Sequence, residues 1–288
     1  MQVVRERLGY RRPFDGIRLL GYLAARAVPG VEEVAGATYR RSLRLARGAG
    51  VVELDLGGAC GGVPARFLLE DSADLAEARA RCADLLDLDA DPGAVRATLG
   101  PDPLIGPLVD RAPGLRLPGS VDPAELAVRA VLGQQVSLAA ARTLAGRLVT
   151  ARGEALPVRV GAVTNLFPAA SALASLAPGR LPMPAARARA VVGLSWAIAR
   201  GDVSLGPGDP AGTRRALLGL PGIGPWTAGY IEMRALRNRD AFLPTDLGLR
   251  RALERLRADP RPAEAERLAE RWRPYRAHAL QYLWGVLA

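Results

Sequence analysis

Residues 217–236, LLGLPGIGPWTAGYIEMRAL, combine residue types that can hold an anion on the protein backbone. Two helical patterns flank the turn PGIG, and Pro225, which has no amide N–H, suits the first position of the second helix. The glycines allow an anion close to the backbone, and the free amides at a helix start attract phosphate oxygens. The segment predicts a helix-hairpin-helix element that binds a phosphate backbone, although glycine and proline at a helix corner also serve geometry alone.

A single carboxylate follows this element at a position where a helix is expected to begin. In residues 242–249, FLPTDLGL, Asp246 comes after Pro244 and Thr245. An aspartate at such a position is most often an N-cap, which accepts the amides of the first turn. A carboxylate close to a bound phosphate backbone also has a chemical use, because its negative charge stabilises a developing cation. The position of Asp246 by itself leaves both interpretations open.

Other reactive side chains are scarce. All 39 basic residues are arginines, so only the N-terminal amine remains for a Schiff base. Cys60, Cys82 and the single histidine, His278, are too few and too scattered for a zinc or iron-sulfur site. We therefore expect no required cofactor and no chemistry through a lysine imine.

The positive charge is concentrated in the second part of the chain. The net charge is +10, and residues 99–288 hold 25 arginines against 15 acidic residues, whereas residues 1–98 hold 14 of each. No acidic residue lies between Glu154 and Asp202. Such a surface attracts a polyanion, which indicates nucleic acid, although an arginine-rich composition also reflects the genome.

The elements that must position these residues fall into two groups. Residues 1–98 predict a small α+β domain, in which Asp15 is a suitable N-cap for an amphipathic helix. Glycine-rich turns separate three segments with two-residue alternation, which indicates an antiparallel sheet. We expect helices at 14–28 and about 72–88, and strands at 38–46, 50–56 and 63–69.

From Gly100 onward the strand signals fade, and the sequence predicts an all-α domain over residues 99–288 that contains the hairpin, at about 212–236, and Asp246. No apolar stretch approaches the roughly 20 residues that a bilayer requires, so we expect neither secretion nor membrane insertion. The expected helices are 123–132, 137–149, 164–176, 185–199, 212–220, 226–236, 246–257 and 262–284.

Five segments that follow one another along the chain match one known family. They are PFDGIRLLGYLAARAVPGVEEV, GLRLPGSVDPAELAVRAVLGQQVS, LPGIGPWTAGY, FLPTDLGL and AERWRPYRAHALQYLW. On these segments the chain resembles bacterial 3-methyladenine DNA glycosylase II, an alkylation-repair family of the helix-hairpin-helix superfamily, over nearly its whole length. The resemblance implies an N-terminal antiparallel α+β domain and a pair of helical parts with the active-site cleft between them.

The resemblance also implies that Asp246 is the catalytic carboxylate. Cleavage of an N-glycosidic bond develops positive charge on the sugar, so a carboxylate beside C1′ stabilises the transition state and orients the attacking water. N-alkylated purines such as 3-methyladenine are cationic and leave as neutral bases, so one carboxylate suffices. Relatives that also cut the strand carry a lysine where this chain has Trp226, which implies a monofunctional glycosylase without lyase activity.

Four aromatic residues, Tyr22, Trp226, Tyr230 and Trp284, match the base pocket of the family. Trp226 and Tyr230 stand at helical spacing, which by itself is more typical of a hydrophobic core. An aromatic pocket suits an electron-poor base flipped out of the duplex, because ring faces favour positive charge without requiring a fixed hydrogen-bond pattern. The resemblance therefore implies a broad substrate range.

Contacts with DNA are implied at a loop and at the hairpin. Gln134 and Gln135, in LGQQVS, correspond to the loop that fills the gap left by the flipped nucleotide. The best-known bacterial form has leucine at the second position, so Gln135 is the expected wedge, with a polar helix cap as the alternative. Phosphate contacts are implied for the amides of Gly222 and Gly224 and for Thr227, and a monovalent cation for the backbone carbonyls of Leu218, Leu220 and Ile223.

Three other functions fit parts of the sequence. A non-catalytic hairpin protein would bind DNA without using Asp246 or the aromatic residues. A glycosylase for oxidised purines or mismatched adenine would need the absent lysine or an iron-sulfur cluster. An alkyl-acceptor protein would need a cysteine in a Pro-Cys-His setting, which Cys60 and Cys82 lack. We expect instead a monomeric enzyme of base excision repair, cytoplasmic and nucleoid-associated in a bacterium, acting on duplex DNA with alkylated bases.

Overall fold

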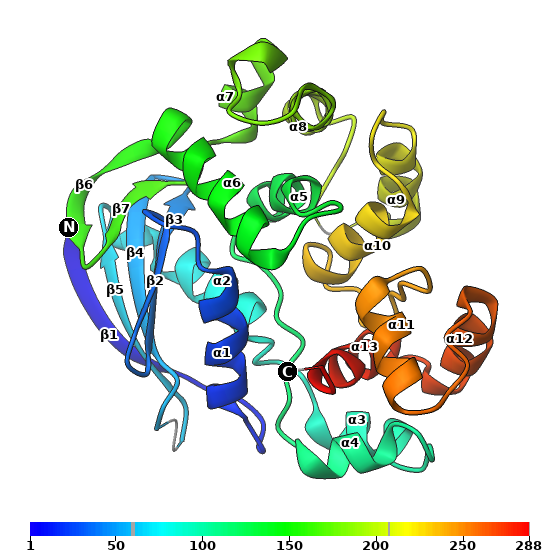
Figure 1. Ribbon diagram of the computed structural model, residues 1–288. Helices are drawn as coiled ribbons and strands as arrows, with labels where there is room; N and C mark the ends of the chain where they lie inside the picture. The colour runs from blue at the N-terminus through cyan, green and yellow to red at the C-terminus, as the bar shows by residue number, and fades with distance from the viewer. Residues whose placement is uncertain (59–60, 207, 288) are drawn as a thin grey trace.

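The structure is a computed structural model that describes residues 1–58, 61–206 and 208–287. A curved antiparallel sheet occupies one side of the molecule, and helices occupy the other (Figure 1). Cys60 lies outside the described residues. Within the described part of the chain, no helix is long and apolar enough to cross a membrane.

The N-terminal body is a five-stranded antiparallel sheet with the order β1-β5-β4-β3-β2, and the predicted α+β class is confirmed. The helices α1 (Gly16–Arg26) and α2 (Leu75–Leu86) pack on one face of the sheet around Tyr39 and Phe67, which are fully buried. Asp15 caps α1, because its side chain accepts the amide of Arg18 at 3.0 Å. The strands are β1 (Gln2–Leu8), β2 (Glu32–Ala35), β3 (Thr38–Leu45), β4 (Gly48–Asp55) and β5 (Val63–Leu69).

The sequence predicted three of these strands and missed β1 and β2. β1 is an edge strand with mostly exposed, charged side chains, so it shows little apolar alternation. β2 is short and begins with Glu32 and Glu33, which are rare residue types in strands. Both glutamates face arginines of β3 in the antiparallel register, and this pairing with a distant segment offsets their poor strand propensity.

Two groups of helices, each with its own hydrophobic core, follow the sheet. The first core lies mainly among α5, α6, α8 and the start of α10, and the second surrounds the fully buried Trp272. The helices are α3 (Pro92–Leu99), α4 (Gly106–Arg111), α5 (Pro123–Leu132), α6 (Leu138–Arg152), α7 (Ala170–Ala174), α8 (Ala185–Arg200), α9 (Pro210–Leu218), α10 (Pro225–Arg234), α11 (Leu247–Arg255), α12 (Pro262–Ala269) and α13 (Arg276–Gly285).

The prediction that residues 99–288 are all α-helical is wrong at one place. A β-hairpin is present, formed by β6 (Glu154–Val160) and β7 (Val163–Leu166), and β7 occupies the start of the helix expected at 164–176. Val163 packs with Val51 and Leu68 on the second face of the main sheet. The hairpin depends on this tertiary contact, which the local sequence does not reveal.

Two further differences concern the helices. The sequence did not predict α3 and α4, and Val95 and Leu99 of α3 share a core with Trp272, so this core includes residues on both sides of the boundary expected at 98. The single helix expected at 262–284 is divided into α12, a short 3₁₀ turn at Glu270–Trp272, and α13. Pro274 lies in this break, because proline cannot supply an amide to a continuing helix.

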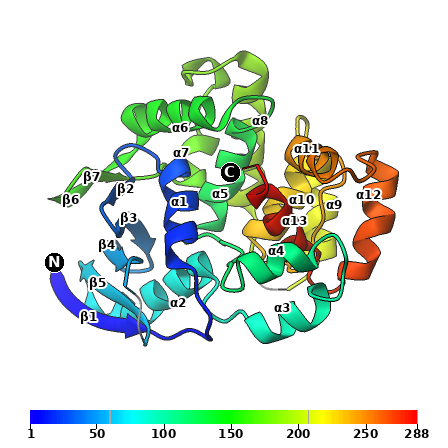
Figure 2. The same ribbon diagram turned by 60° about the horizontal axis from the view of Figure 1, so that its bottom comes forward.

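The helices α1, α5, α10 and α13 converge near the centre of the molecule, as Figure 2 shows. They belong to all three cores: α1 to the sheet body, α5 to the first helical group and α13 to the second, while α10 contributes to both helical groups. Residues of all four helices line a cavity. The fold therefore places its cavity where the three bodies meet.

Candidate active site

Asp246 is the N-cap of α11, and its carboxylate is held by three neutral donors. Its Oδ1 accepts the amide of Leu249 at 2.7 Å, as an N-cap does. Oδ1 also accepts the indole N–H of Trp284, and Oδ2 accepts that of Trp226, both at 2.8 Å. Asp246 is 8% exposed. The N-cap interpretation is therefore correct, and it leaves a nearly buried carboxylate in one fixed orientation.

Gly248 allows this close packing at the start of α11. A Cβ at this position would lie 3.0 Å from Asp246 Oδ1 and 3.0 Å from the Trp284 indole. Such a distance is shorter than an ordinary van der Waals contact, so a larger residue would displace the indole from the carboxylate. The glycine in FLPTDLGL thus serves the site directly.

A cavity of about 330 Å³ lies beside the carboxylate. All four aromatic residues predicted for a pocket line it together with Asp246: Tyr22 from α1, Trp226 and Tyr230 from α10, and Trp284 from α13. The Trp226 and Tyr230 rings are stacked, with centroids 5.2 Å apart and planes at 11°. The volume and the mixed aromatic and polar lining are typical of a small-molecule site.

A buried guanidinium lies behind these rings. The Arg234 guanidinium carbon is 5.1, 5.8 and 5.5 Å from the ring centres of Tyr22, Tyr230 and Trp284. Arg234 is completely buried. Its terminal nitrogens donate to neutral oxygens, the Pro118 carbonyl at 2.8 Å and the side-chain oxygen of Gln281 at 2.6 Å.

A second guanidinium, that of Arg26, lies 3.8 Å from the centre of the Tyr22 ring. Burial raises the pKa of Tyr22, but the charges of Arg234 and Arg26 outweigh burial and lower the pKa to about 8. The hydroxyls of Tyr22 and Tyr230 are 3.5 Å apart, and the pKa of Tyr230 is raised by burial and by Tyr22. Tyr22 is therefore the more acidic of the two hydroxyls.

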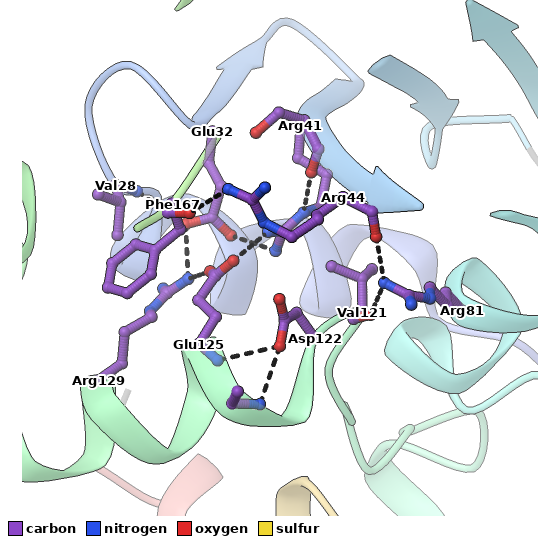
Figure 3. A network of polar contacts seen from close by, with 12 residues as sticks. Val28, Glu32, Arg41, Arg44, Arg81, Val121, Asp122, Glu125, Arg129 and Phe167 are labelled. Carbon is purple, nitrogen blue, oxygen red and sulfur yellow. Dashed lines mark hydrogen bonds and ion pairs between the residues drawn. The ribbon is translucent and has the colours of Figure 1, made fainter. Parts of the chain in front are cut away.

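A ring of four charged side chains also lines the cavity, three of them buried and the fourth, Arg129, partly buried (Figure 3). Glu32 and Glu125 each pair with both Arg41 and Arg129, at 2.7–3.3 Å. Burial raises the pKa of Glu32, but Arg129 and Arg41 outweigh it, and the pKa is lowered. Arg129 also donates to the backbone carbonyl of Arg26 at 2.7 Å, so the ring holds the end of α1 that carries Tyr22 and Arg26.

The predicted hairpin lies between α9 and α10. Gly222 has φ +85°, and a Cβ there would lie 2.9 Å from the Cβ of Ala190, so the turn requires glycine at this position. Gly224 is the N-cap of α10, and a Cβ there would meet no atom within 4 Å. The amides at the start of α10 are available to a phosphate from this open side.

The loop between α5 and α6 gives its two glutamines different positions. Gln134 donates to the Gly222 carbonyl at 2.9 Å and to Thr227 Oγ1 at 2.8 Å, so its side chain joins the loop to the hairpin. Thr227 is 2% exposed, and its hydroxyl faces Gln134 rather than solvent. Gln135 is exposed and has φ +53°, a conformation that costs energy for a residue other than glycine.

Sequence reasoning missed the arginines and glutamates of the cavity. A signal for two of them was present, because Arg26 follows Tyr22, and Arg234 follows Tyr230, by four residues in a helix, which places each pair on one face. The ring of Glu32, Arg41, Glu125 and Arg129 has no comparable local pattern.

Cys82 and His278 lie outside the cavity lining. Burial raises the pKa of the Cys82 thiol to about 12, so it is a poor nucleophile. His278 is buried, with Nε2 at 3.4 Å from an Asp87 carboxylate oxygen. Among the described residues, no group of three or more His, Cys, Asp or Glu side chains is arranged to hold a metal ion.

Two solved structures with a similar fold are named as glycosylases. A 3-methyladenine DNA glycosylase from Archaeoglobus fulgidus aligns with a TM-score of 0.84 and 21% identity over 98% of this chain and 97% of that one. The 8-oxoguanine glycosylase/lyase of Clostridium acetobutylicum aligns with a TM-score of 0.66 and 18% identity over 88% and 98%. The chain therefore has the fold of the helix-hairpin-helix DNA glycosylases.

Sequence comparisons narrow this class to one family. Residues 5–122 match the family described as the AlkA N-terminal domain. DNA-3-methyladenine glycosylase 2 of Escherichia coli is 38% identical over 96% of this chain and 95% of that protein. The chain belongs to the AlkA family of DNA-3-methyladenine glycosylases, as the sequence motifs predicted.

A second relative is longer. The probable bifunctional transcriptional activator/DNA repair enzyme AlkA of Mycobacterium tuberculosis is 48% identical over 98% of this chain, but the match spans 56% of that protein. The chain thus spans about half the length of this relative.

Proposed function

We propose that the protein removes alkylated bases, of the 3-methyladenine type, from duplex DNA by hydrolysing the N-glycosidic bond. The relative named DNA-3-methyladenine glycosylase 2 supports this activity, and the longer relative is named as a DNA repair enzyme. The single observation that carries the proposal is the fixed carboxylate of Asp246 at an aromatic cavity large enough for a small molecule. An alkylation-repair role in the bacterial cytoplasm, associated with the nucleoid, is part of the same proposal.

In this proposal, Asp246 acts on the sugar rather than on the base. As the C1′–N bond lengthens, positive charge grows on the sugar, and a carboxylate whose donors are all neutral retains its negative charge to stabilise it. The same oxygens can orient the water that adds to C1′. Hydrolysis yields a free base and an abasic sugar. Without a lysine there is no imine step, so the strand stays uncut.

The damaged nucleotide must leave the duplex to reach this carboxylate. We therefore assign the following residues to contacts with the DNA and with the extruded base. Gln135, exposed at the tip of its loop, fills the gap as a wedge, while Gln134 fixes that loop to the hairpin. The amides near Gly222 and Gly224 bind phosphate. Thr227 stabilises this region from the buried side, because its hydroxyl accepts a hydrogen bond from Gln134. The aromatic residues Tyr22, Trp226, Tyr230 and Trp284 enclose the extruded base.

A monovalent cation at the hairpin is also compatible with the residues present. The carbonyls of Leu218, Leu220 and Ile223 would hold it; the Leu220 carbonyl accepts the Ile223 amide at 3.1 Å, which leaves one of its lone pairs for an ion. The cation would add positive charge beside a bound phosphate. Catalysis as proposed uses no cofactor, and we expect the protein to act as a monomer.

The test compares the wild type with Asp246→Asn on duplex DNA that carries 7-methylguanine. Asparagine is as good an N-cap as aspartate, so α11 should persist while the charge is lost. We expect single-turnover base release, measured by chromatography, to fall by at least about 100-fold. The matched control is Asp91→Asn, which alters the N-cap of α3, outside the cavity lining. Equal release by wild type and Asp246→Asn would contradict the assignment, and no release by the wild type would contradict the proposed function.

A further inference from the structure

The charges around the base cavity do not match a purely cationic substrate. An alkylated purine that already carries positive charge gains nothing from nearby guanidiniums. The structure nevertheless places Arg26 and Arg234 against the aromatic wall, 3.8 and 5.1 Å from the centre of the Tyr22 ring. Arg26 donates to the backbone carbonyl of Tyr22 at 3.2 Å. Arg234 donates to the Pro118 carbonyl and to the side-chain oxygen of Gln281, both of which are neutral. These acceptor oxygens are all uncharged, so the contacts do not neutralise the positive charge beside the Tyr22 ring.

We propose that Tyr22 donates a proton to the leaving base when the damaged base is uncharged. This inference rests on the proposed glycosylase function and extends it to bases that would otherwise depart as anions. The Tyr22 side chain lines the same cavity as Asp246. Tyr230 connects the two, because its ring stacks on Trp226, which donates to Asp246, while its hydroxyl meets that of Tyr22.

The proton transfer balances as a simple hydrolysis. The C1′–N bond breaks, and the base takes the electron pair. The Tyr22 hydroxyl gives its proton to a ring nitrogen of the departing base and becomes a phenolate. Water adds to C1′, and the proton that the water loses restores Tyr22 through solvent. The products are a neutral free base and an abasic sugar, and no oxidant, reductant or metal is required.

The surroundings of Tyr22 suit a side chain that alternates between phenol and phenolate. The charged and titratable groups around it are Arg26 on the same helix, Arg129 on α5, and Tyr230 and Arg234 on α10. The three arginines stabilise the phenolate by charge, and the less acidic Tyr230 donates a hydrogen bond to it. The pKa of about 8 is close to working pH, where a general acid is most effective.

Two lesions separate this role from ordinary packing. 7-Methylguanine is cationic near neutral pH and leaves as a neutral base, so it needs no proton. 1,N6-Ethenoadenine is uncharged and has no acidic proton in this pH range. It would leave as an anion, so it needs a proton from a donor on the enzyme. Tyr22→Phe keeps the ring and removes the hydroxyl, so a packing role would affect both lesions alike.

The experiment measures single-turnover release of each base from duplex oligonucleotides at saturating enzyme. For Tyr22→Phe we expect release of ethenoadenine to fall about 100-fold further than release of 7-methylguanine, because the ring that encloses the base is kept and only the proton donor is lost. The matched control is Tyr282→Phe, which removes a buried hydroxyl that donates to the Ala112 carbonyl at 3.2 Å, outside the cavity lining. This control should leave both rates unchanged.

The pH profile gives a second readout. Tyr22 keeps its proton below pH about 8 and loses it above, so wild-type release of ethenoadenine should fall on the alkaline side, and Tyr22→Phe should show no such fall. An equal loss on both lesions, or no loss on ethenoadenine, would overturn the role of Tyr22. A wild type that releases methylated but not etheno bases would overturn this inference and leave the proposed function standing.

Discussion

Asp246 shows how a nearly buried carboxylate can keep its charge available for chemistry. An arginine partner would neutralise the charge, and an unpaired carboxylate would be expensive to bury. Here two indole N–H groups and one backbone amide stabilise the charge without cancelling it. The two tryptophans thus combine two tasks, since their rings line the cavity and their N–H groups fix the carboxylate.

These tasks can be separated at Trp226. Trp226→Phe keeps an aromatic ring in the cavity but removes the donor to Asp246 Oδ2. Hydrogen bonds to charged groups contribute about 1.5–3 kcal/mol. We therefore expect single-turnover release of 7-methylguanine to fall at least about 10-fold, with little change in DNA affinity. Trp196→Phe is the control, because Trp196 is half exposed on α8. An unchanged rate for Trp226→Phe would show that the indole donor is dispensable.

At the scale of single residues, the sequence predicted those side chains whose type and motif indicate a chemical role. Asp246 and the four aromatic residues belong to recognisable segments, and the structure places all of them around one cavity. Arg26 and Arg234 escaped prediction, because an arginine on a helix is usually solvated, and only the tertiary fold brings both guanidiniums to the Tyr22 ring and buries Arg234. Thr227 was expected to contact phosphate, but its side chain is directed at Gln134.

At the scale of elements, the hairpin depends on the difference between its two glycines. Gly222 has φ +85° and lies against Ala190 of α8, whereas Gly224 is extended and open. The PGIG pattern alone could not distinguish a turn that packs tightly from an end that faces a ligand. The carbonyl of Gly222 also accepts a hydrogen bond from the Gln134 side chain. The same turn therefore holds the loop between α5 and α6 that carries the proposed wedge Gln135, called the wedge loop below.

Alanine at each glycine tests this difference. Gly222→Ala combines an unfavourable φ with a Cβ contact of 2.9 Å, so we expect a loss of about 1–3 kcal/mol in the free energy of unfolding. Gly224→Ala should change that free energy by less than about 0.5 kcal/mol. Urea titration followed by circular dichroism measures both. Similar losses for the two variants would contradict the assigned roles of the glycines.

Elements with strong local periodicity could be predicted, and those that depend on distant partners could not. Helices such as α5 and α8 appear where their apolar spacing places them. The strands β2 and β7 rely instead on β3, through the Glu32–Arg41 register and a hydrogen bond from Ser42 to the Asn165 carbonyl at 2.7 Å. A local pattern cannot report such contacts.

At the scale of the whole molecule, the ring of four charges joins the sheet to the helical part. Glu32 and Arg41 belong to the sheet, and Glu125 and Arg129 belong to α5, which leads into the wedge loop (Figure 3). Because the pKa of Glu32 is lowered in the folded protein, its contribution to stability is present above the unfolded-state pKa and is lost as pH falls through the folded value.

Replacement of one residue of the ring should show how much this junction contributes to the free energy of unfolding and to the rate of base release. Glu125→Gln leaves the buried Arg41 and the partly buried Arg129 to share Glu32, and breaking the buried Arg41–Glu125 ion pair in this way costs about 3–5 kcal/mol. We expect a lower urea midpoint and also slower base release, because Arg129, once unbalanced, holds the carbonyl of Arg26 less firmly and α1 loosens at the cavity. Glu266→Gln, on an exposed site of α12, should change neither quantity. A Glu125→Gln protein as stable and as active as the wild type would show that the charge of Glu125 does not contribute to the junction between the sheet and α5.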